Sequence, residues 1–344
     1  MRKFEGFERG VNLGGWLSQI SEVSYEHFDT FITEEDIKKI ASWGLDHVRV
    51  PVDYFVIETE DGQPIERGYE YIDKCVSWCR KHGLHMIIDI HKTFGYTFDP
   101  LDKTDKLIFF HSEELQKRFY NFWRTISRRY SKDCDIVAYE LLNEIVSPEV
   151  VAEWNEIATK AVAAIREDSP NTWVIYGGVC YNAVSSVEKL PNPNDDKVVH
   201  TFHCYEPMIF THQGAFWVTG MPLDFRTSYP VTESTYREML TKLPPELANA
   251  IDPEAIKLDG EAFFESMFES AIAAAEKNNV PLYCGEYGVI DRASCEDTLR
   301  WVEKIGSVFR KHGIGRSYWN FKSMDYEICG ERFAKDIDKL VKLL

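Results

Sequence analysis

The feature that most constrains this chain is a regular alternation of short apolar runs with longer amphipathic stretches. Eight apolar runs predict strands buried on both faces, at residues 10–13, 47–50, 85–90, 136–142, 173–177, 198–203, 282–286 and 315–319. Seven stretches between or after them have helical periodicity, at about 33–43, 69–82, 112–130, 149–168, 262–279, 294–312 and 331–344. This alternation predicts an α/β fold, a closed (β/α)8 TIM barrel. A doubly wound open sheet is the alternative, but no GxGxxG pattern follows the first strand.

Local signals mark where several of these helices begin and end. Thr33 and Ser112 each precede acidic residues, which is typical of a helix N-terminus. Gly44, Gly83 and Gly313 each follow a predicted helix, where a left-handed backbone conformation commonly ends one. No internal repeat divides the chain, so we expect residues 1–344 to form a single barrel domain.

One connection is much longer than the others. Residues 206–262 separate the sixth strand from its helix, whereas such loops usually contain about 2–6 residues. The segment contains an aromatic-rich stretch at 208–217 and a short predicted helix near 232–242. We expect an inserted subdomain over the active-site face of the barrel. A surface insertion without a functional role is the alternative.

The charge of the chain argues against two classes of partner. It carries 39 Lys and Arg against 56 Asp and Glu, a formal net charge of −17, and no basic patch stands out. Nucleic acids and anionic membrane surfaces are bound by such patches, so we expect neither as a partner. Aromatic residues make up 14% of the chain, and their flat rings suit the faces of a neutral sugar.

The cysteines and the first residues bear on the compartment. The eight cysteines are scattered, without CxxC or zinc-ligand spacing, so we expect reduced core residues; a structural disulfide is the alternative. The first residues lack the apolar segment of a secretory signal, and no run reaches the ~18 apolar residues of a membrane helix. We expect a cytoplasmic protein, or a secreted one if a leader was removed.

Polar and aromatic residues gather where the predicted strands end. In a parallel barrel the catalytic side chains lie at the carboxyl ends of the strands. A single charged residue there is usually a rim charge, whereas six strand ends with this selection form a more specific set. The residues are Arg49, His91, Asn143, Glu144, His203, Tyr205, Glu286 and Trp319.

Two of these residues, Glu144 and Glu286, end strands that face each other across a barrel. Cleavage of a glycosidic bond needs such a pair, because one carboxyl protonates the leaving oxygen and the other attacks the sugar carbon or activates water. A separation of about 5–5.5 Å gives retention of configuration, and about 6.5–9.5 Å gives inversion. A structural role for both acids and a metal site are the alternatives. No HxH or HExxH motif occurs, so we expect no metal and no other cofactor.

The segments around these residues resemble glycoside hydrolase family 5, the large cellulase family of barrel enzymes. Residues 27–34 also resemble clostridial endoglucanases of the family that lack an export signal and carry a subdomain after strand 6. The matching segments occur in the family's order over nearly the whole chain: Arg9-Gly10-Val11-Asn12-Leu13-Gly14-Gly15-Trp16, His47-Val48-Arg49-Val50-Pro51, Asp89-Ile90-His91, Leu141-Leu142-Asn143-Glu144, His203-Cys204-Tyr205, Gly285-Glu286-Tyr287-Gly288 and Tyr318-Trp319-Asn320.

The resemblance implies a retaining mechanism with one role for each glutamate. Glu144 would be the general acid and base, and Glu286 would be the nucleophile. Arg49 and Tyr205 would contact the Glu286 carboxylate, and the cation would keep it ionised. The negative charge of Glu286 would in turn keep Glu144 protonated until the glycosyl ester forms.

The resemblance also implies which residues contact the sugar. Asn143 would bind the 2-hydroxyl, His91 and His203 would line the site of the reacting sugar, and Trp319 would stack beneath it. Among the other tryptophans only Trp217 lies where a sugar could reach, and the remainder are expected in the core. His111 and His212 stay unassigned.

Lys92 departs from the family pattern. Many relatives have a second histidine at this position, directly after the histidine of strand 3. The lysine would contact a sugar hydroxyl or pair with an acid such as Asp99 or Asp102, and a solvated loop lysine is the alternative. Lys92 therefore bears on substrate preference and leaves the mechanism unchanged.

We expect the substrate to be a β-glucan or gluco-oligosaccharide, cleaved by an endo-β-1,4-glucanase. A β-mannanase and an exo-acting β-glucosidase are the alternatives among retaining enzymes. A catalytically silent sugar-binding barrel is the alternative from another class, and the presence of both glutamates and Arg49 counts against it. A metal-dependent hydrolase would lose its activity to a chelator.

Overall fold

The computed structural model describes residues 1–20, 22–243 and 260–344, and it confirms the predicted barrel. Eight parallel strands close in sequence order, with β1 paired to both β2 and β8. The strands are β1 (Arg9–Asn12), β2 (His47–Asp53), β3 (His85–Lys92), β4 (Val137–Glu140), β5 (Val174–Gly177), β6 (Val198–Cys204), β7 (Leu282–Tyr287) and β8 (Gly315–Tyr318). They coincide with the predicted runs to within one residue at each end, except that β2 continues to Asp53, β3 continues to Lys92 and β4 already ends at Glu140.

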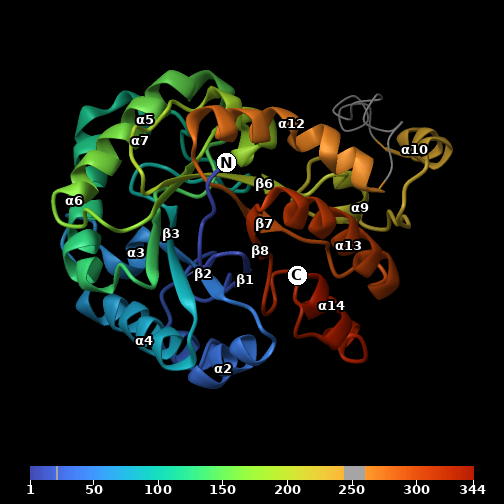
Figure 1. The fold of residues 1–344 in the computed structure, drawn as a ribbon, viewed down its shortest axis with the longest axis horizontal. Helices are drawn as coiled ribbons and strands as arrows, with labels where there is room; N and C mark the ends of the chain where they lie inside the picture. Colours follow the sequence, from blue (N-terminus) through green and yellow to red (C-terminus); the bar gives the residue numbers. More distant parts are fainter. Residues whose placement is uncertain (21, 244–259) are drawn as a thin grey trace.

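Helices surround the strands on the outside of the barrel (Figure 1). The longer ones are α2 (Glu34–Ser42), α4 (Glu66–His82), α6 (Glu113–Tyr130), α7 (Val151–Arg166), α12 (Gly260–Asn278) and α13 (Cys295–His312). The shorter ones are α1 (Tyr25–Phe31), α3 (Tyr54–Ile57), α5 (Ile108–His111), α8 (Val179–Asn182), α9 (Met208–Thr211), α10 (Glu233–Leu240) and α14 (Ile337–Leu343), with 3₁₀ turns η1 (Ser131–Asp133), η2 (Pro148–Val150), η3 (Val184–Lys189) and η5 (Glu331–Phe333).

Most predicted helices are confirmed together with their end signals. Ser112 Oγ accepts a hydrogen bond from the N–H of Leu115 and caps α6. Gly83 and Gly313 follow α4 and α13 with φ of 73° and 66°, in the left-handed region that glycine adopts without strain. The predicted helix at 331–344 is wrong in its first half, where the structure has η5 before the shorter α14.

The long connection after β6 contains the predicted short helix. This helix is α10, and α9 precedes it within the aromatic-rich stretch. Figure 1 shows α10 at the edge of the molecule, beyond α9 and the end of α12. Residues 244–259 of the predicted insertion lie outside the described part of the chain.

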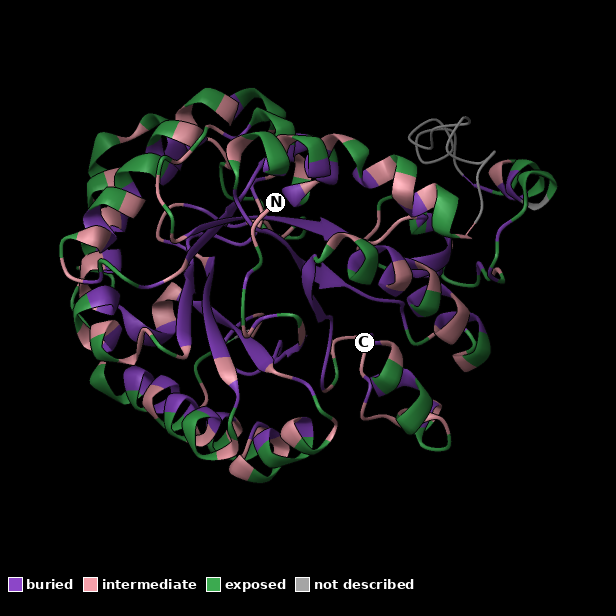
Figure 2. Ribbon diagram, in the orientation of Figure 1, coloured by how far each residue is buried: buried purple, intermediate pink, exposed green. Residues whose placement is uncertain are grey.

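The core lies in two places, inside the barrel and between the strands and the helices. The strands are buried almost throughout, and the outer helices are buried only on the sides that face them (Figure 2). The amino-terminal end of the barrel interior is filled by a separate apolar cluster, formed by Phe4, Phe7, Ile87, Ala138, Ile175, Val199 and Tyr283.

Side chains on a strand alternate between its two faces, so the pleat carries this interior layer toward the carboxyl end. Asp89 follows Ile87 on the same face of β3, and Glu140 follows Ala138 on the same face of β4. Both acids are fully buried. The polar side chains of the barrel interior therefore start directly above the apolar layer, on its carboxyl-terminal side.

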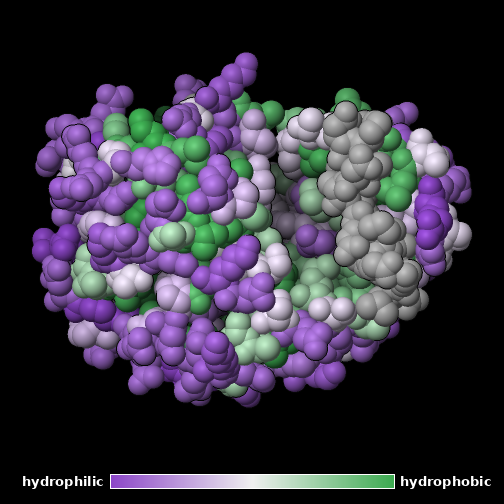
Figure 3. Space-filling view, turned by 90° about the horizontal axis from the view of Figure 1, so that it is seen from above, coloured by the Kyte–Doolittle hydropathy of each residue, from purple (hydrophilic) through white to green (hydrophobic). Residues whose placement is uncertain are grey.

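Two further features of the described residues agree with the sequence. All eight cysteines are free, including the buried Cys75 and Cys79. None of the helices in the described ranges is both long and apolar enough to cross a bilayer. Seen from above, the surface is hydrophilic over much of its area and is hollowed to the right of its centre (Figure 3).

Candidate active site

The site is organised around Arg49, a fully buried side chain on β2. Its Nε and Nη2 donate to the two carboxylate oxygens of Glu140 at 2.7 and 2.9 Å. Nη1 donates to Oε1 of Glu286 at 2.8 Å, and Nη2 lies 3.0 Å from Oδ2 of Asp89. Burial acts to lower the pKa of Arg49, but the three carboxylates raise it well above its ordinary value.

Two asparagines complete the contacts of this guanidinium. Nη1 donates to Oδ1 of Asn12 at 2.9 Å, and Nη2 donates to Oδ1 of Asn143 at 2.8 Å. Because the cation occupies the amide oxygen of Asn143, its NH2 group is the part available to a ligand. Arg49 thus fixes the orientation of the predicted 2-hydroxyl contact.

Glu286, at 6% exposed, is held by a cation on one oxygen and a hydroxyl on the other. Arg49 donates to Oε1, and the hydroxyl of Tyr205 donates to Oε2 at 2.9 Å. Burial raises the pKa of Glu286, whereas Arg49 and Tyr205 act to lower it. The structure therefore brings Arg49, Tyr205 and Glu286 together as the sequence predicted.

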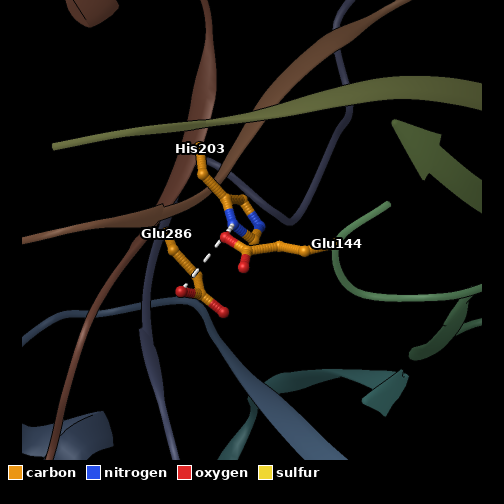
Figure 4. A group of neighbouring side chains, drawn as sticks. All are labelled: Glu144, His203 and Glu286. Carbon is orange, nitrogen blue, oxygen red and sulfur yellow. Dashed lines mark hydrogen bonds and ion pairs between the residues drawn. The ribbon is translucent and has the colours of Figure 1, made fainter. Parts of the chain in front are cut away.

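Glu144 has a different environment, although it lies beside Glu286 (Figure 4). Its Oε1 is 2.8 Å from Nδ1 of His203, a nitrogen that is also 3.7 Å from Oε2 of Glu286. Burial, together with the charge of Glu286, raises the pKa of Glu144 well above its ordinary value. Burial holds the pKa of His203 well below its ordinary value, so this ring is neutral. Glu144 is therefore the member of the pair that keeps a proton.

The two carboxyl groups are close enough for direct cooperation. One oxygen of each glutamate and one nitrogen of His203 lie within 4.8 Å of one another. Three such groups could in principle hold a metal ion, but both oxygens of Glu286 already accept hydrogen bonds, one from a cation. A divalent ion there would meet the guanidinium of Arg49. The arrangement of Glu144, His203 and Glu286 therefore favours proton transfer by the two carboxyl groups over binding of a metal ion.

The rings of His91 and Trp319 lie parallel to each other in the site. Nδ1 of His91 is 2.6 Å from Oδ2 of Asp89, and burial lowers the pKa of His91 to about 3, which leaves the ring neutral. The imidazole and the indole of Trp319 are parallel, with an interplanar angle of 1° and centroids 5.9 Å apart. The peptide bond between Trp319 and Asn320 is cis.

Gly14 makes room for this indole. A Cβ at position 14 would lie 2.4 Å from Cη2 of Trp319, closer than real atoms approach. The backbone of Gly14 is fixed by the amide of Asn320, which accepts from its N–H and donates to its carbonyl oxygen, both at 2.9 Å. The loop after β1 therefore cannot retreat to accommodate a methyl group.

We expect the substitution Gly14→Ala to displace the indole and to lower kcat/KM for oligosaccharides about tenfold, the loss of roughly one good aromatic contact. The thermal unfolding midpoint should change little by comparison. Gly44→Ala is the contrasting control, because Gly44 has φ of 74° with no atom near a Cβ. It should lower the midpoint and leave kcat/KM intact. Equal kcat/KM in Gly14→Ala and the unmodified enzyme would contradict the close contact.

The inserted segment contributes aromatic rings to the same wall. Trp217 packs against Tyr326 at a centroid distance of 6.3 Å and joins the apolar cluster that contains Trp319. His212 bonds Thr211 and packs edge-on against Tyr205 at 5.1 Å, a packing role of the kind expected for an unassigned loop histidine. Trp217 is half-buried and does not contact either catalytic candidate directly in the described contacts.

Lys92 lies at the end of β3 with its side chain 15% exposed. Its Nζ is 3.9 Å from Oδ2 of Asp99, as one of the expected pairings predicts, and 4.0 Å from Oδ2 of Asp53. The other expected partner, Asp102, accepts hydrogen bonds from Thr104 instead. Lys92 is therefore not a solvated loop lysine.

Sequence reasoning did not assign roles to Asn12, Asp89 and Glu140. All three are fully buried within strands and converge on Arg49. A usable signal was present, because a charged residue inside a strand buried on both faces needs a partner of opposite charge.

A closed parallel barrel with two carboxyl groups facing each other at its carboxyl-terminal end defines a glycoside hydrolase of the barrel type. The model of the cellulase family, glycosyl hydrolase family 5, matches residues 8–325, and the chain belongs to this family. It is 44% identical to cellodextrinase A of Ruminococcus flavefaciens over 92% of this chain and 86% of that protein. It is 40% identical to endoglucanase C of Acetivibrio thermocellus, over 98% of both chains.

Solved structures of lower identity have the same fold. Endoglucanase Cel5A of the hyperthermophilic Thermotoga maritima superposes with a TM-score of 0.74 at 24% identity, over 98% of this chain and 97% of that one. The cellulose synthase subunit Z of Clostridioides difficile superposes with a TM-score of 0.77 at 22% identity, over 98% and 99% of the chains.

Proposed function

We propose that this enzyme is a retaining endo-β-1,4-glucanase that cleaves soluble β-glucans and gluco-oligosaccharides. The observation that carries the mechanism is the pair of carboxyl groups with oxygens within 4.8 Å, of which Glu286 alone accepts a hydrogen bond from Arg49. A gap of this size has no room for the water that inversion places between the carboxyl groups. The names of two relatives, an endoglucanase and a cellodextrinase, support the substrate class.

In the first step, ionised Glu286 attacks the anomeric carbon, and the bond between this carbon and the leaving oxygen breaks. Glu144 donates its proton to that oxygen, and a glycosyl ester forms on Glu286. Asn143 offers its NH2 group to the 2-hydroxyl, a contact that strengthens in the transition state. His91 and Trp319 support the reacting sugar, and His203 positions Glu144.

In the second step, water attacks the anomeric carbon of the ester while Glu144 removes its proton, and the bond from this carbon to Glu286 breaks and releases the carboxylate. Esterification abolishes the charge of Glu286, so the pKa of Glu144 falls and the carboxylate becomes a base. The proton requirement of each step is met by the same residue. The anomeric configuration is inverted twice and is therefore retained.

The described residues of the long connection after β6, 206–243, belong in this proposal to a subdomain that borders the path of the substrate. The packing of Trp217 and Ala215 with Trp319 and Tyr326 supports this role. The eight free cysteines support a reducing compartment, since disulfides form in oxidising ones.

The products formed from defined glucans test the function. Cellohexaose should yield a mixture of cellobiose, cellotriose and cellotetraose, and mixed-linkage glucan should be cleaved faster than mannan or laminarin. Glucose released one unit at a time would indicate an exo-acting β-glucosidase, and preference for mannan a β-mannanase. If none of these substrates is cleaved, the remaining interpretation is a catalytically silent sugar-binding barrel.

The substitution Glu144→Gln separates the acid from the nucleophile. It removes the transferable proton but keeps the shape and an oxygen for the contact with His203. We expect kcat on cellohexaose to fall about 10³-fold, the scale of general acid catalysis, and the rate of the first step on 2,4-dinitrophenyl β-cellobioside to fall far less. Equal losses on both substrates would show that Glu144 is not the acid.

A further inference from the structure

A further set of polar side chains lies behind His203, inside the barrel at the carboxyl ends of β5 and β6. It consists of Asn182, Thr201 and His203, which we call the inner polar group, and all three side chains are buried. Nδ2 of Asn182, Oγ1 of Thr201 and Nε2 of His203 have no hydrogen-bond partner among the described residues. Polar atoms buried in native proteins are nearly always paired, so these three atoms need a shared connection.

The strand register places the amide of Asn182 beside Thr201. Gly177 of β5 pairs with Thr201 of β6, and paired residues of neighbouring strands face the same side of a sheet. A Cβ at Gly177 would overlap the amide oxygen of Asn182 and lie 2.6 Å from its Nδ2, so this amide occupies the space of the missing side chain. The amide oxygen accepts from the N–H of Gly178 at 3.2 Å, which leaves the NH2 group as the unpaired end.

His203 adjoins the same part of the barrel from the end of β6. Thr201 and His203 are two residues apart on one strand and therefore share a face. A Cβ at Gly285 of β7 would lie 3.2 Å from Oγ1 of Thr201 and 3.1 Å from Nε2 of His203. Ala183, the residue after Asn182, forms a parallel bridge with His203. The three unpaired atoms therefore gather in one part of the barrel interior.

The backbone that carries Asn182 is strained. Cys180, Tyr181 and Asn182 each have φ of 57°, in the left-handed region that residues with a Cβ rarely adopt. Strain of this kind persists where the surrounding structure imposes it, and it is concentrated at functional sites. Here it turns the chain after β5 so that the amide of Asn182 returns over Gly177.

The inner polar group has a direction of hydrogen bonding. In the described residues no direct hydrogen bond joins its three unpaired atoms, and buried water commonly connects such groups. The NH2 group of Asn182 can only donate, whereas a hydroxyl or a water accepts from one neighbour and donates to the next. A chain that begins at Asn182 and passes Thr201 therefore ends by donating to Nε2 of His203. Because the ring is neutral, an Nε2 that accepts leaves the proton on Nδ1.

The tautomer of His203 determines where the proton of Glu144 lies. When Nδ1 carries the ring proton, it donates to Oε1 of Glu144 at 2.8 Å (Figure 4). Oε1 is then the carbonyl oxygen of the acid, and the transferable proton lies on Oε2. If Nε2 carried the ring proton, Nδ1 would accept a hydrogen bond from the carboxyl group, and the acidic proton would face His203 instead of the leaving oxygen.

We propose that Asn182 and Thr201 are positioning residues that act on His203 through bound water. Their donation to Nε2 holds the ring as the Nδ1–H tautomer and keeps the acidic proton of Glu144 on the oxygen that faces the leaving group. The inference rests on the proposed hydrolysis of β-glucosides, in which Glu144 is the acid. Both positioning residues are fully buried and act through His203.

The NMR signals of the His203 ring nitrogens test the tautomer in the intact enzyme with isotopically labelled histidine, because protonated and bare ring nitrogens resonate far apart. The signals are identified by their loss in His203→Gln. We expect a protonated Nδ1 in the unmodified enzyme and a smaller fraction of this form in Thr201→Val and in Asn182→Gly, where glycine keeps the left-handed backbone. A protonated Nε2 in the unmodified enzyme, or an unchanged fraction in both variants, would overturn the proposal.

The dependence on the leaving group tests the effect on the acid. Phenyl β-cellobioside needs a proton on its leaving oxygen, whereas 2,4-dinitrophenyl β-cellobioside does not. The ratio of kcat/KM for the phenyl substrate to that for the dinitrophenyl substrate should fall about tenfold in Thr201→Val, the scale of one hydrogen bond, and several-fold in Asn182→Gly. Thr201→Ser keeps the hydroxyl and should restore the ratio.

Thr172→Val is the matched control for these measurements. It also removes a fully buried threonine hydroxyl, but before the amino-terminal end of β5, and should keep the ratio of the unmodified enzyme. Equal losses on both substrates in Thr201→Val would overturn the positioning role, because the hydroxyl would then only support the fold. Failure of the unmodified enzyme to cleave either cellobioside would instead overturn the proposed function, and the signals of His203 would still report its tautomer.

Discussion

Replacement of Glu286 by glycine should abolish turnover of cellohexaose, with kcat reduced on the order of 10⁵-fold, as removal of a covalent nucleophile does in other enzymes. The loss follows from the geometry. Among the described residues, Glu286 is the carboxylate that accepts hydrogen bonds from both Arg49 and Tyr205, and no second carboxylate shares this position. Azide should restore activity on 2,4-dinitrophenyl β-cellobioside, since a small anion can occupy the space left by the carboxylate beside the guanidinium.

The stereochemistry of the rescued product is the decisive readout. Azide that replaces Glu286 attacks from the face opposite the leaving group and should give an α-glycosyl azide. The control is Glu144→Ala, in which azide should enter from the other face, attack the glycosyl ester and give the β-glycosyl azide. A β-product from the Glu286→Gly variant, or turnover of cellohexaose near that of the unmodified enzyme, would contradict the assignment of the nucleophile.

Replacement of Arg49 by methionine should have the largest effect on stability. It leaves Asp89, Glu140 and Glu286 buried near one another without a cation, a change that destabilises proteins by about 3–5 kcal/mol. Burial already raises the pKa of Asp89 and of Glu140 to about 7, with Arg49 acting to lower both. Without Arg49 these values should rise further.

The loss of stability caused by Arg49→Met should increase with pH. A carboxyl group with a folded-state pKa above its unfolded value binds protons more strongly when folded, so its contribution to stability decreases as pH rises above the unfolded value. The difference in thermal unfolding midpoint between the unmodified enzyme and Arg49→Met should therefore be larger at pH 8 than at pH 5. Arg128→Met is the control, because Arg128 forms an exposed ion pair with Asp168 and should change the midpoint little at either pH. A difference that is constant with pH would contradict the buried network.

The barrel could be predicted because its strands are buried on both faces. Runs such as 85–90 contain few polar residues, and a helix of clear periodicity follows most of them. The end of the chain was harder to predict. Its apolar spacing continues through 331–344, but Asp336 has a non-helical φ of −123° and accepts from the N–H groups of Lys339 and Leu340, so a new helix begins at Ile337.

The site could be predicted where residues lie at or just beyond the carboxyl ends of strands. Glu144 and Trp319 follow β4 and β8, Glu286 is the last residue but one of β7, and their positions follow from the barrel alone. Asp89 and Glu140 lie within strands, and their convergence on Arg49 depends on the stagger of three strands, which local sequence does not specify. The partners of Lys92 depend on the same stagger, which is why Asp53 was not among those considered.

The seam between the first and last strands has a consequence for how the enzyme is made. The amide side chain of Asn320 bonds both the N–H and the carbonyl oxygen of Gly14. The N–H of Phe321 donates to the carbonyl oxygen of Asn12 at 3.0 Å. A nascent chain that has emerged from the ribosome only as far as β7 already contains both glutamates and the arginine. It lacks the indole of Trp319 and the strand that β1 must pair with. Catalytic competence therefore arrives with the last few dozen residues, and a prematurely terminated product should be inert even though it retains every charged group of the mechanism.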